Sequence, residues 1–204
     1  NFNIFIRSIL LSFSFLYFTY LGTSISEETV AANVILLNLI MLSSYVLDAY
    51  AFSTEGIVGY SIGSKNKKLL KDVIKNSFIL NTVTGLVICL IVFLSKNYYI
   101  MIMTDLSAIR EISFSYSYWA IIIPFAASFC FLFDGIFIGA SQTRELRNAM
   151  IISVVIYIVV SFFLITSFGN TGLWLSLFIF FIARAVTLFS YMGRIYGRIT
   201  PDQS

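Results

Sequence analysis

The sequence predicts an all-α, polytopic membrane protein with six transmembrane helices. Of its 204 residues, 59% are hydrophobic and only 11% are charged, and the mean hydropathy is +0.92. Soluble domains carry about 25% charged residues. Several apolar runs exceed the roughly 18 residues that indicate a membrane-spanning helix. These runs are too long for a transmembrane β-barrel, whose strands alternate in polarity over about 10 residues.

Polar turns divide the apolar sequence into six predicted spans. They cover about 5–21, 30–62, 74–94, 111–139, 149–166 and 173–192. The first ends at Gly22, and Ser24 with Glu27 fits a capping box that opens the second. The second is on the order of 50 Å long, more than the bilayer core of about 30 Å, so it is expected to tilt, bend or protrude.

The last three spans contain a proline and a glycine turn. Pro124 lies near the middle of the fourth span, where a kink would free backbone carbonyls and provide a possible hinge. The segment Gly169–Gly172, with the sequence Gly-Asn-Thr-Gly, predicts a tight turn between the fifth and sixth spans.

Positive charge is concentrated in alternate loops, which predicts the orientation. One set of segments carries ten cationic residues: Arg7, Lys65, Lys67, Lys68, Lys71, Lys75, Arg144, Arg147, Arg194 and Arg198. The alternate loops carry only Lys96 and Arg110. Because cytoplasmic loops hold the excess of Lys and Arg, both ends of this segment are expected to be cytoplasmic. The lysine-rich loop is interpreted as an orientation signal, with binding of anionic lipid or nucleotide as the alternative.

Two carboxyl groups interrupt the second span and are candidates for ion or substrate coupling. Asp48 and Glu55 are seven residues apart, so they share one helix face about 10 Å apart. Near the same stripe lie the candidate cavity-lining residues Asn38, Ser44, Tyr45 and Phe52. A carboxylate that binds a proton in one conformation and releases it in another could couple transport to an ion gradient. Buried, hydrogen-bonded structural acids are the alternative.

Three further charged residues lie within predicted spans. Asp134 is a third coupling candidate, or else a structural acid paired with Arg144 or Arg147. Arg184 and Arg7 are interpreted as structural residues that snorkel or pair with an acid. Arg184 lies at a depth where it could meet Glu55 or Asp134.

The sequence excludes several kinds of site. It contains no histidine, so a histidine-based proton relay or metal site is excluded, and no catalytic residues are predicted. Cys89 and Cys130 both lie in apolar runs, which favours two buried thiols rather than a disulfide. The pairs Gly59-x-x-x-Gly63 and Gly135-x-x-x-Gly139 suit close helix packing. Each pair follows an intramembrane aspartate, so the second and fourth spans are interpreted as weakly related internal repeats, which are common in transporters.

Several short motifs together carry a family resemblance. They lie within Asn3–Arg7, Asp48–Gly59, Asp134–Ala140, Arg147–Met150, Gly169–Trp174 and Ala183–Leu188. Their order and spacing resemble the multidrug and toxic compound extrusion (MATE) transporters, in the DinF-like branch. The resemblance covers essentially the whole chain.

The resemblance implies twelve helices in two six-helix lobes around a central cavity. Residues 1–204 are similar to the C-terminal lobe, so the N-terminal lobe is the expected partner, with membrane lipids and amphiphilic small molecules. Proton-coupled members place a key acid on the first helix of the first lobe, outside this sequence. Sodium-coupled members of another branch use an acid on helix seven, and the corresponding span 5–21 contains none.

The expected function is part of a secondary active antiporter in the inner (plasma) membrane. It would export organic, often cationic, amphiphiles in exchange for protons or sodium by alternating access. No enzymatic activity, cofactor, metal or nucleic-acid partner is expected. Two alternatives stay open: a flippase or lipid-processing enzyme for lipid-linked substrates, and a truncated half without transport of its own. Because the chain starts at Asn1 without an initiating Met, we expect a fragment or a natural half-protein.

Overall fold

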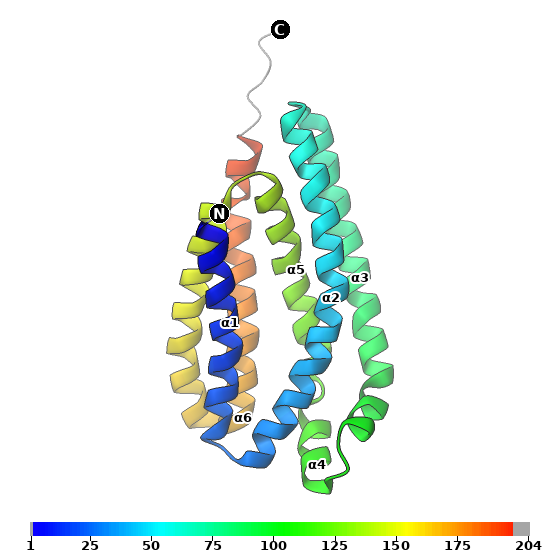
Figure 1. The fold of residues 1–204 in the computed structure, drawn as a ribbon, viewed down its shortest axis with the longest axis vertical. Coiled ribbons are helices and arrows are strands. Elements are labelled where there is room, and N and C mark those ends of the chain that lie inside the picture. The colour runs from blue at the N-terminus through cyan, green and yellow to red at the C-terminus, as the bar shows by residue number, and fades with distance from the viewer. Residues whose placement is uncertain (1, 198–204) are drawn as a thin grey trace.

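The helices of the computed structural model, which describes residues 2–197, form one elongated bundle (Figure 1). They are α1 (Phe2–Thr23), α2 (Glu27–Gly63), α3 (Lys67–Met103), α4 (Ser107–Tyr116), α5 (Trp119–Gly139) and α6 (Thr143–Tyr196). All except α4 are long and apolar enough to cross a membrane. The predicted all-α membrane fold is therefore confirmed.

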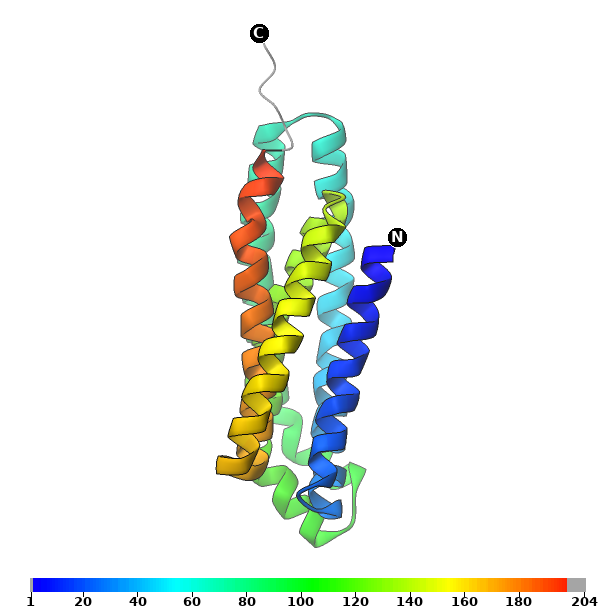
Figure 2. The ribbon, with the colours of Figure 1, turned by 90° about the vertical axis from the view of Figure 1, so that its left-hand side faces the viewer.

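The last helix, α6, doubles back on itself. It has 54 residues but reverses direction at Gly169, so its two arms run side by side (Figures 1 and 2). Gly169 has φ 56°, a left-handed conformation that glycine adopts without strain. A Cβ atom on Gly172 would lie 2.0 Å from the backbone oxygen of Leu164, so the arms meet too closely for a side chain there. The arms, 143–168 and 170–196, correspond to the fifth and sixth predicted spans.

The predicted fourth span, 111–139, is wrong at its start. The helix stops at Tyr116 and resumes at Trp119 as α5. The backbone N–H groups of Ser117 and Ala120 donate to carbonyls three residues back, those of Phe114 and Ser117, so a tight turn separates α4 from α5. Pro124 lies buried inside α5, and the chain breaks before Trp119 instead of at the proline. A hinge at Pro124 stays a prediction.

The cap of α2 also differs from the expected one. Ser26 is the N-cap, and its hydroxyl accepts a hydrogen bond from the backbone N–H of Thr29 at 3.1 Å. Ser24 instead donates to the carbonyl of Leu21 at 2.7 Å, so it closes α1. Glu27 follows the cap in the first turn of α2, where the helix dipole favours a negative charge.

The cationic segments gather at one end of the bundle. The start of α1, the α2–α3 and α5–α6 loops and the end of α6 lie toward the upper end in Figures 1 and 2. Lys96 and Arg110 belong to the end of α3 and to α4, which lie at the lower end. Arg198 lies outside the described residues. The cation-rich loops therefore lie at one end of the axis that would cross the bilayer, and the cation-poor loops lie at the other end.

Close packing of α5 on α2 depends on two glycines. A Cβ on Gly135 would lie 2.3 Å from the backbone oxygen of Ala51, and one on Gly139 would lie 2.4 Å from that of Glu55. The pair predicted on α2 behaves differently. Gly59 faces the backbone of Gly139, whereas a Cβ on Gly63 would meet nothing within 4 Å. Only the α5 pair therefore provides the expected close packing.

A buried amide network joins α2 to the second arm of α6. Asn33 donates to Asn170 at 2.7 Å and accepts from it at 3.1 Å, and the indole N–H of Trp174 donates to Asn33 at 2.9 Å. All three side chains are buried. Asn33 of α2 thus satisfies two polar side chains of α6 across an apolar interface.

Replacing Asn33 with alanine is expected to destabilise the protein by about 2 kcal/mol, because it leaves Trp174 and Asn170 buried without their partner. The melting temperature (Tm) of the detergent-purified protein measures the effect. The control, Asn97→Ala, changes an exposed asparagine and is expected to leave Tm unchanged. Equal Tm values for the two variants would contradict a stabilising role for this network.

Candidate functional site

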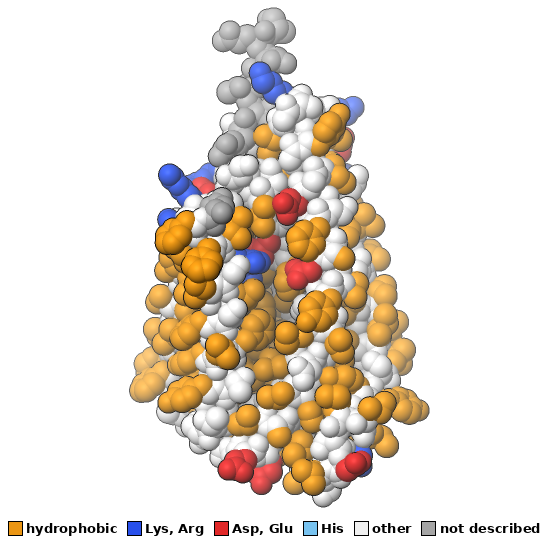
Figure 3. All heavy atoms as spheres, in the orientation of Figure 1, with side chains coloured by type: hydrophobic (Ala, Val, Ile, Leu, Met, Phe, Trp, Pro, Cys, Tyr) orange, Lys and Arg blue, Asp and Glu red, His pale blue; other side chains and the backbone are white. Residues whose placement is uncertain are grey.

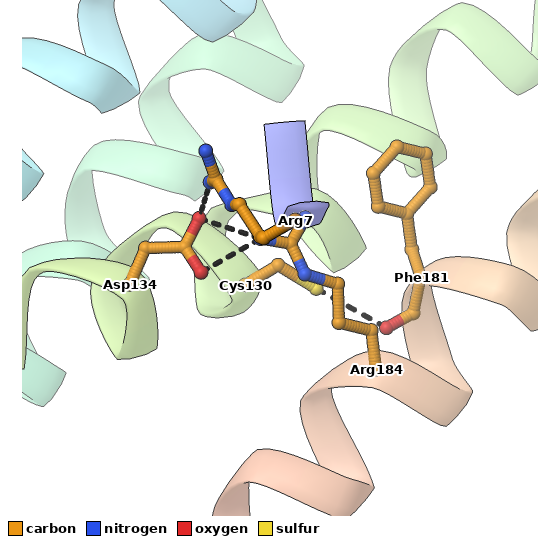
Figure 4. A network of polar contacts seen from close by, with 5 residues as sticks. All are labelled: Arg7, Cys130, Asp134, Phe181 and Arg184. Atoms are coloured by element: carbon orange, nitrogen blue, oxygen red, sulfur yellow. Dashed lines mark hydrogen bonds and ion pairs between the residues drawn. The ribbon is translucent and has the colours of Figure 1, made fainter. Parts of the chain in front are cut away.

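A buried cluster of three charged residues joins α1, α5 and α6 (Figure 4). Nη2 of Arg184, on the second arm of α6, donates to both carboxylate oxygens of Asp134 at 2.6 Å. Nη2 of Arg7, on α1, donates to the same carboxylate. Only 4% of the surface of Asp134 and 1% of that of Arg184 is exposed. We call Arg7, Asp134 and Arg184 the charge cluster.

The charge cluster holds more cationic donors than its carboxylate can satisfy. Within the described residues, Nε of Arg7 and Nη1 of Arg184 are buried without a hydrogen-bond partner. Nearby, the thiol of Cys130 donates to the carbonyl of Phe181 at 3.2 Å (Figure 4). Two guanidinium groups sharing one carboxylate leave a local excess of positive charge, which favours further acidic groups close by.

Such acidic groups line the pocket next to the cluster. A pocket of about 240 Å³ is bordered by Ile4, Arg7, Asp48, Ala51, Phe52, Glu55, Asp134, Gly135 and Ile138. We call it the acid pocket. Figure 3 shows acidic and basic side chains gathered in this hollow over α1 and α2, framed by apolar groups. Asp48 interacts electrostatically with both arginines of the charge cluster.

The two acids of α2 are more exposed than Asp134 and, unlike it, are not held in ion pairs among the described residues. Asp48 and Glu55 are half-buried, and neither forms a hydrogen bond or ion pair with any residue in 2–197. Asp134 is enclosed and paired twice. The pocket therefore presents two unpaired carboxyl groups toward its opening and keeps a neutralised one at its base.

The four predicted cavity-lining residues do not lie in one cavity. Phe52 borders the acid pocket, whereas Asn38 and Tyr45 border a separate pocket of about 260 Å³ between α2 and the end of α3. The hydroxyl of Ser44 donates to the carbonyl of Ile40 in its own helix at 2.9 Å. The stripe expected on α2 is thus divided between two pockets, because a helix of 37 residues reaches both halves of the bundle.

Arg144 and Arg147, the two predicted partners of Asp134, do not form an ion pair with it. Arg147 donates to the side chains of Asn3 and Asn148, and Arg144 is exposed. Asp134 pairs instead with Arg7 and Arg184, which come from the first and last helices. The spacing from Asp48 could have identified Ala51 as a pocket residue, since it lies three residues along the same helix face.

The described part of the chain contains no cluster of metal-binding side chains. Within residues 2–197, no group of three or more His, Cys, Asp or Glu side chains could hold a metal ion. Cys89 and Cys130 are free thiols. The site therefore offers carboxylates, guanidinium groups and aromatic surface as its binding chemistry.

The sequence matches a family model and a curated relative. The MatE family model matches residues 4–163. The chain is also similar to the DNA damage-inducible protein F of Escherichia coli (strain K12), with 29% identity over 188 residues, which are 92% of this chain and 41% of that protein. This chain thus spans about two fifths of the length of that relative.

The fold is similar to about half of several solved transporter structures. A MOP superfamily transporter from Pyrococcus furiosus matches with a TM-score of 0.84 and 16% identity, covering 94% of this chain and 43% of that one. An outward-facing multidrug resistance MATE family transporter matches with a TM-score of 0.85, 16% identity and the same coverage. The Vibrio cholerae MATE transporter in the bent form gives 0.81 and 15% identity, over 94% of this chain and 44% of that one.

The predicted resemblance and the predicted one-lobe architecture are both confirmed by these matches. Neither the family nor its matched structures are enzymes, in agreement with the transporter expected from the sequence. The family match over most of the sequence and the half-transporter fold show that this chain belongs to the MATE family of multi-pass membrane transporters.

Proposed function

We propose that the chain is the C-terminal lobe of a secondary active antiporter that exports organic, often cationic, amphiphiles in exchange for protons or sodium. The N-terminal lobe would complete a central cavity between the two lobes, and alternating access would expose it to each side of the membrane in turn. We place the lysine-rich end of the bundle in the cytoplasm, because cytoplasmic loops carry the excess of Lys and Arg. The inner (plasma) membrane is the proposed location.

The acid pocket is the observation that carries this proposal. Its two unpaired carboxyl groups, Asp48 and Glu55, lie beside the ring of Phe52, whose side chain is largely exposed. An amphiphilic cation needs this combination of a negative group for its charge and an apolar surface for its body. A carboxylate at this depth also serves as an exchange site for a proton or sodium ion.

Within the pocket we assign different roles to the three acids. Asp48 is the proposed coupling carboxylate, because it interacts electrostatically with both arginines of the charge cluster and forms no hydrogen bond or ion pair within residues 2–197. Glu55, two turns nearer the lysine-rich loop, would guide the cation on its path. Asp134 is the proposed anchor of the cluster, since two guanidinium groups already hold it.

Asp48→Asn is expected to lower transport of a cationic dye about tenfold or more. A hydrogen bond or ion pair with a charged group contributes about 1.5–3 kcal/mol, and about 1.4 kcal/mol is a factor of ten. The measurement is dye movement in vesicles that contain the complete transporter and carry an imposed pH or sodium gradient.

Asp72→Asn is the matched control, because Asp72 is an exposed aspartate in the first turns of α3. It is expected to transport like the unaltered protein, and both variants are expected to keep their wild-type Tm. Full activity of Asp48→Asn would return Asp48 to a structural role. Absence of gradient-driven movement for any cationic dye would contradict the antiporter proposal and favour a lipid-linked substrate.

A further inference from the structure

An apolar groove lies on the face of the lobe opposite the acid pocket. Its lining is Phe78 of α3, Phe129 and Phe133 of α5, and Ala185, Val186 and Phe189 of α6, around a volume of about 220 Å³. We call it the aromatic groove. The helix α5 forms its floor and packs against both α3 and α6, whereas α3 and α6 hardly touch each other. Figure 2 shows α3 and the second arm of α6 toward the left of the bundle and α1 toward the right.

The groove is shaped by aromatic rings in edge-to-face contact and extends along α3. The ring of Phe133 lies 5.5 Å from that of Phe78 and 6.4 Å from that of Phe189, measured between centroids. Phe78 also borders a second, largely apolar hollow of about 320 Å³ with Ile79, Thr82 and Val83. Together the two hollows offer a continuous apolar surface of the kind that an extended hydrocarbon chain covers.

Four lysines lie above this groove on the same face of α3. Each residue turns a helix by about 100°, so Lys67, Lys68, Lys71 and Lys75 all fall within a sector of about 100°. Phe78 falls in the same sector, about 5 Å below Lys75 and about 16 Å below Lys67 along the axis. All four lysines are exposed, and none forms an ion pair within residues 2–197.

From this juxtaposition we propose that the aromatic groove and the four lysines form a binding site for an anionic phospholipid. The lysines would hold the phosphate-bearing headgroup in the interface, and the groove would take an acyl chain. An orientation signal requires only an excess of positive charge in the loop. It does not require four lysines in one sector above an apolar groove, so this arrangement favours a ligand with an anionic head and an apolar tail.

The groove also lies where a lipid can reach it. The acid pocket is lined by residues of α1, α2 and α5, and we place its opening on the face that meets the other lobe. The aromatic groove is lined by α3, α5 and α6, on the far side of α5. A zwitterionic lipid would fill the apolar part equally well but would leave the lysines without a matching charge. The distinguishing property of the site is therefore its preference for an anionic headgroup.

The test compares phosphatidylglycerol with phosphatidylethanolamine of the same chain length. Each is titrated against the complete transporter in detergent, and native mass spectrometry measures the bound lipid. The variant exchanges neighbours on α3 (Lys71→Asp with Asp72→Lys, and Lys75→Asn with Asn76→Lys), which keeps composition and net charge but moves two lysines out of the sector. We expect the preference for phosphatidylglycerol to fall about thirtyfold, which corresponds to about 2 kcal/mol.

A second variant tests the groove without altering any charge. Val186→Trp places a large ring in the groove from an exposed position, so it is expected to lower binding of phosphatidylglycerol while the lysines remain. Val159 is also an exposed valine of α6 but borders neither hollow, and Val159→Trp is the matched control expected to bind like the unaltered protein. Equal binding of the two lipids by the unaltered protein, or an unchanged preference in the exchanged variant, would overturn the proposal.

Discussion

Asp134→Asn is expected to destabilise the folded protein by about 3–5 kcal/mol, the largest effect of any single substitution considered for this lobe. Within residues 2–197, the change removes the only carboxylate that contacts Arg184, whose side chain is 1% exposed, and also removes the carboxylate partner of Arg7. The buried guanidinium of Arg184 and the partly buried one of Arg7 would then lack a hydrogen-bonded carboxylate, and desolvation of such groups is costly. Thermal unfolding of the complete protein in detergent measures the loss.

Asp105→Asn is the matched control for this result. Asp105 also pairs with an arginine, at 3.1 Å from Arg110, but its side chain is fully exposed. Exposed ion pairs contribute about 0–1 kcal/mol, so Tm should hardly change. A triple variant (Arg7→Leu, Asp134→Leu, Arg184→Met) is expected to recover much of the stability, since apolar replacement of a whole buried ion cluster is often neutral or stabilising. A wild-type Tm for Asp134→Asn would contradict the structural role of the cluster.

Alanine at both Gly135 and Gly139 is expected to destabilise the protein by on the order of 3 kcal/mol, because overpacking costs about 1–3 kcal/mol per site. Each new Cβ would lie within 2.4 Å of a backbone oxygen of α2, at Ala51 or Glu55. Backbone atoms of a helix cannot move aside as a side chain can, so α2 and α5 must separate. The Tm of the purified variant measures this loss.

Gly56→Ala gives the opposite expectation and serves as the control. A Cβ at Gly56 would meet nothing within 4 Å, and alanine is favoured over glycine inside a helix by about 0.5–1 kcal/mol. The two glycine variants should therefore shift Tm in opposite directions. If the double alanine variant on α5 unfolds at or above the wild-type Tm, close backbone packing does not hold these two helices together.

Hydropathy predicted the membrane helices because long apolar runs are stable in the hydrocarbon core of a bilayer. The turn at Gly169 was also predictable, since glycine adopts the backbone angles of this turn without strain. The break at Ser117 was not predicted, because the apolar pattern continues across it. Hydrophobic periodicity shows which face of a helix is apolar and carries no signal for a short tight turn within the run.

Pairings between distant helices were the least predictable part of the site. Proximity in sequence suggested Arg144 or Arg147 as partners of Asp134, yet its partners are 127 and 50 residues away. The network of Asn33, Asn170 and Trp174 gave no signal, since single amides occur in many apolar helices. By contrast, the seven-residue spacing of Asp48 and Glu55 placed both on one pocket, because helix geometry fixes that relation.

The charge cluster also has a consequence for biogenesis. Arg7 enters the growing chain 127 residues before Asp134, and Arg184 follows another 50 residues later. At translation rates of about 5–20 residues per second, Arg7 waits roughly 6–25 s for its counter-charge. During that interval Arg7 lacks its hydrogen-bonded counter-charge, and the cluster is complete only when the second arm of α6 supplies Arg184.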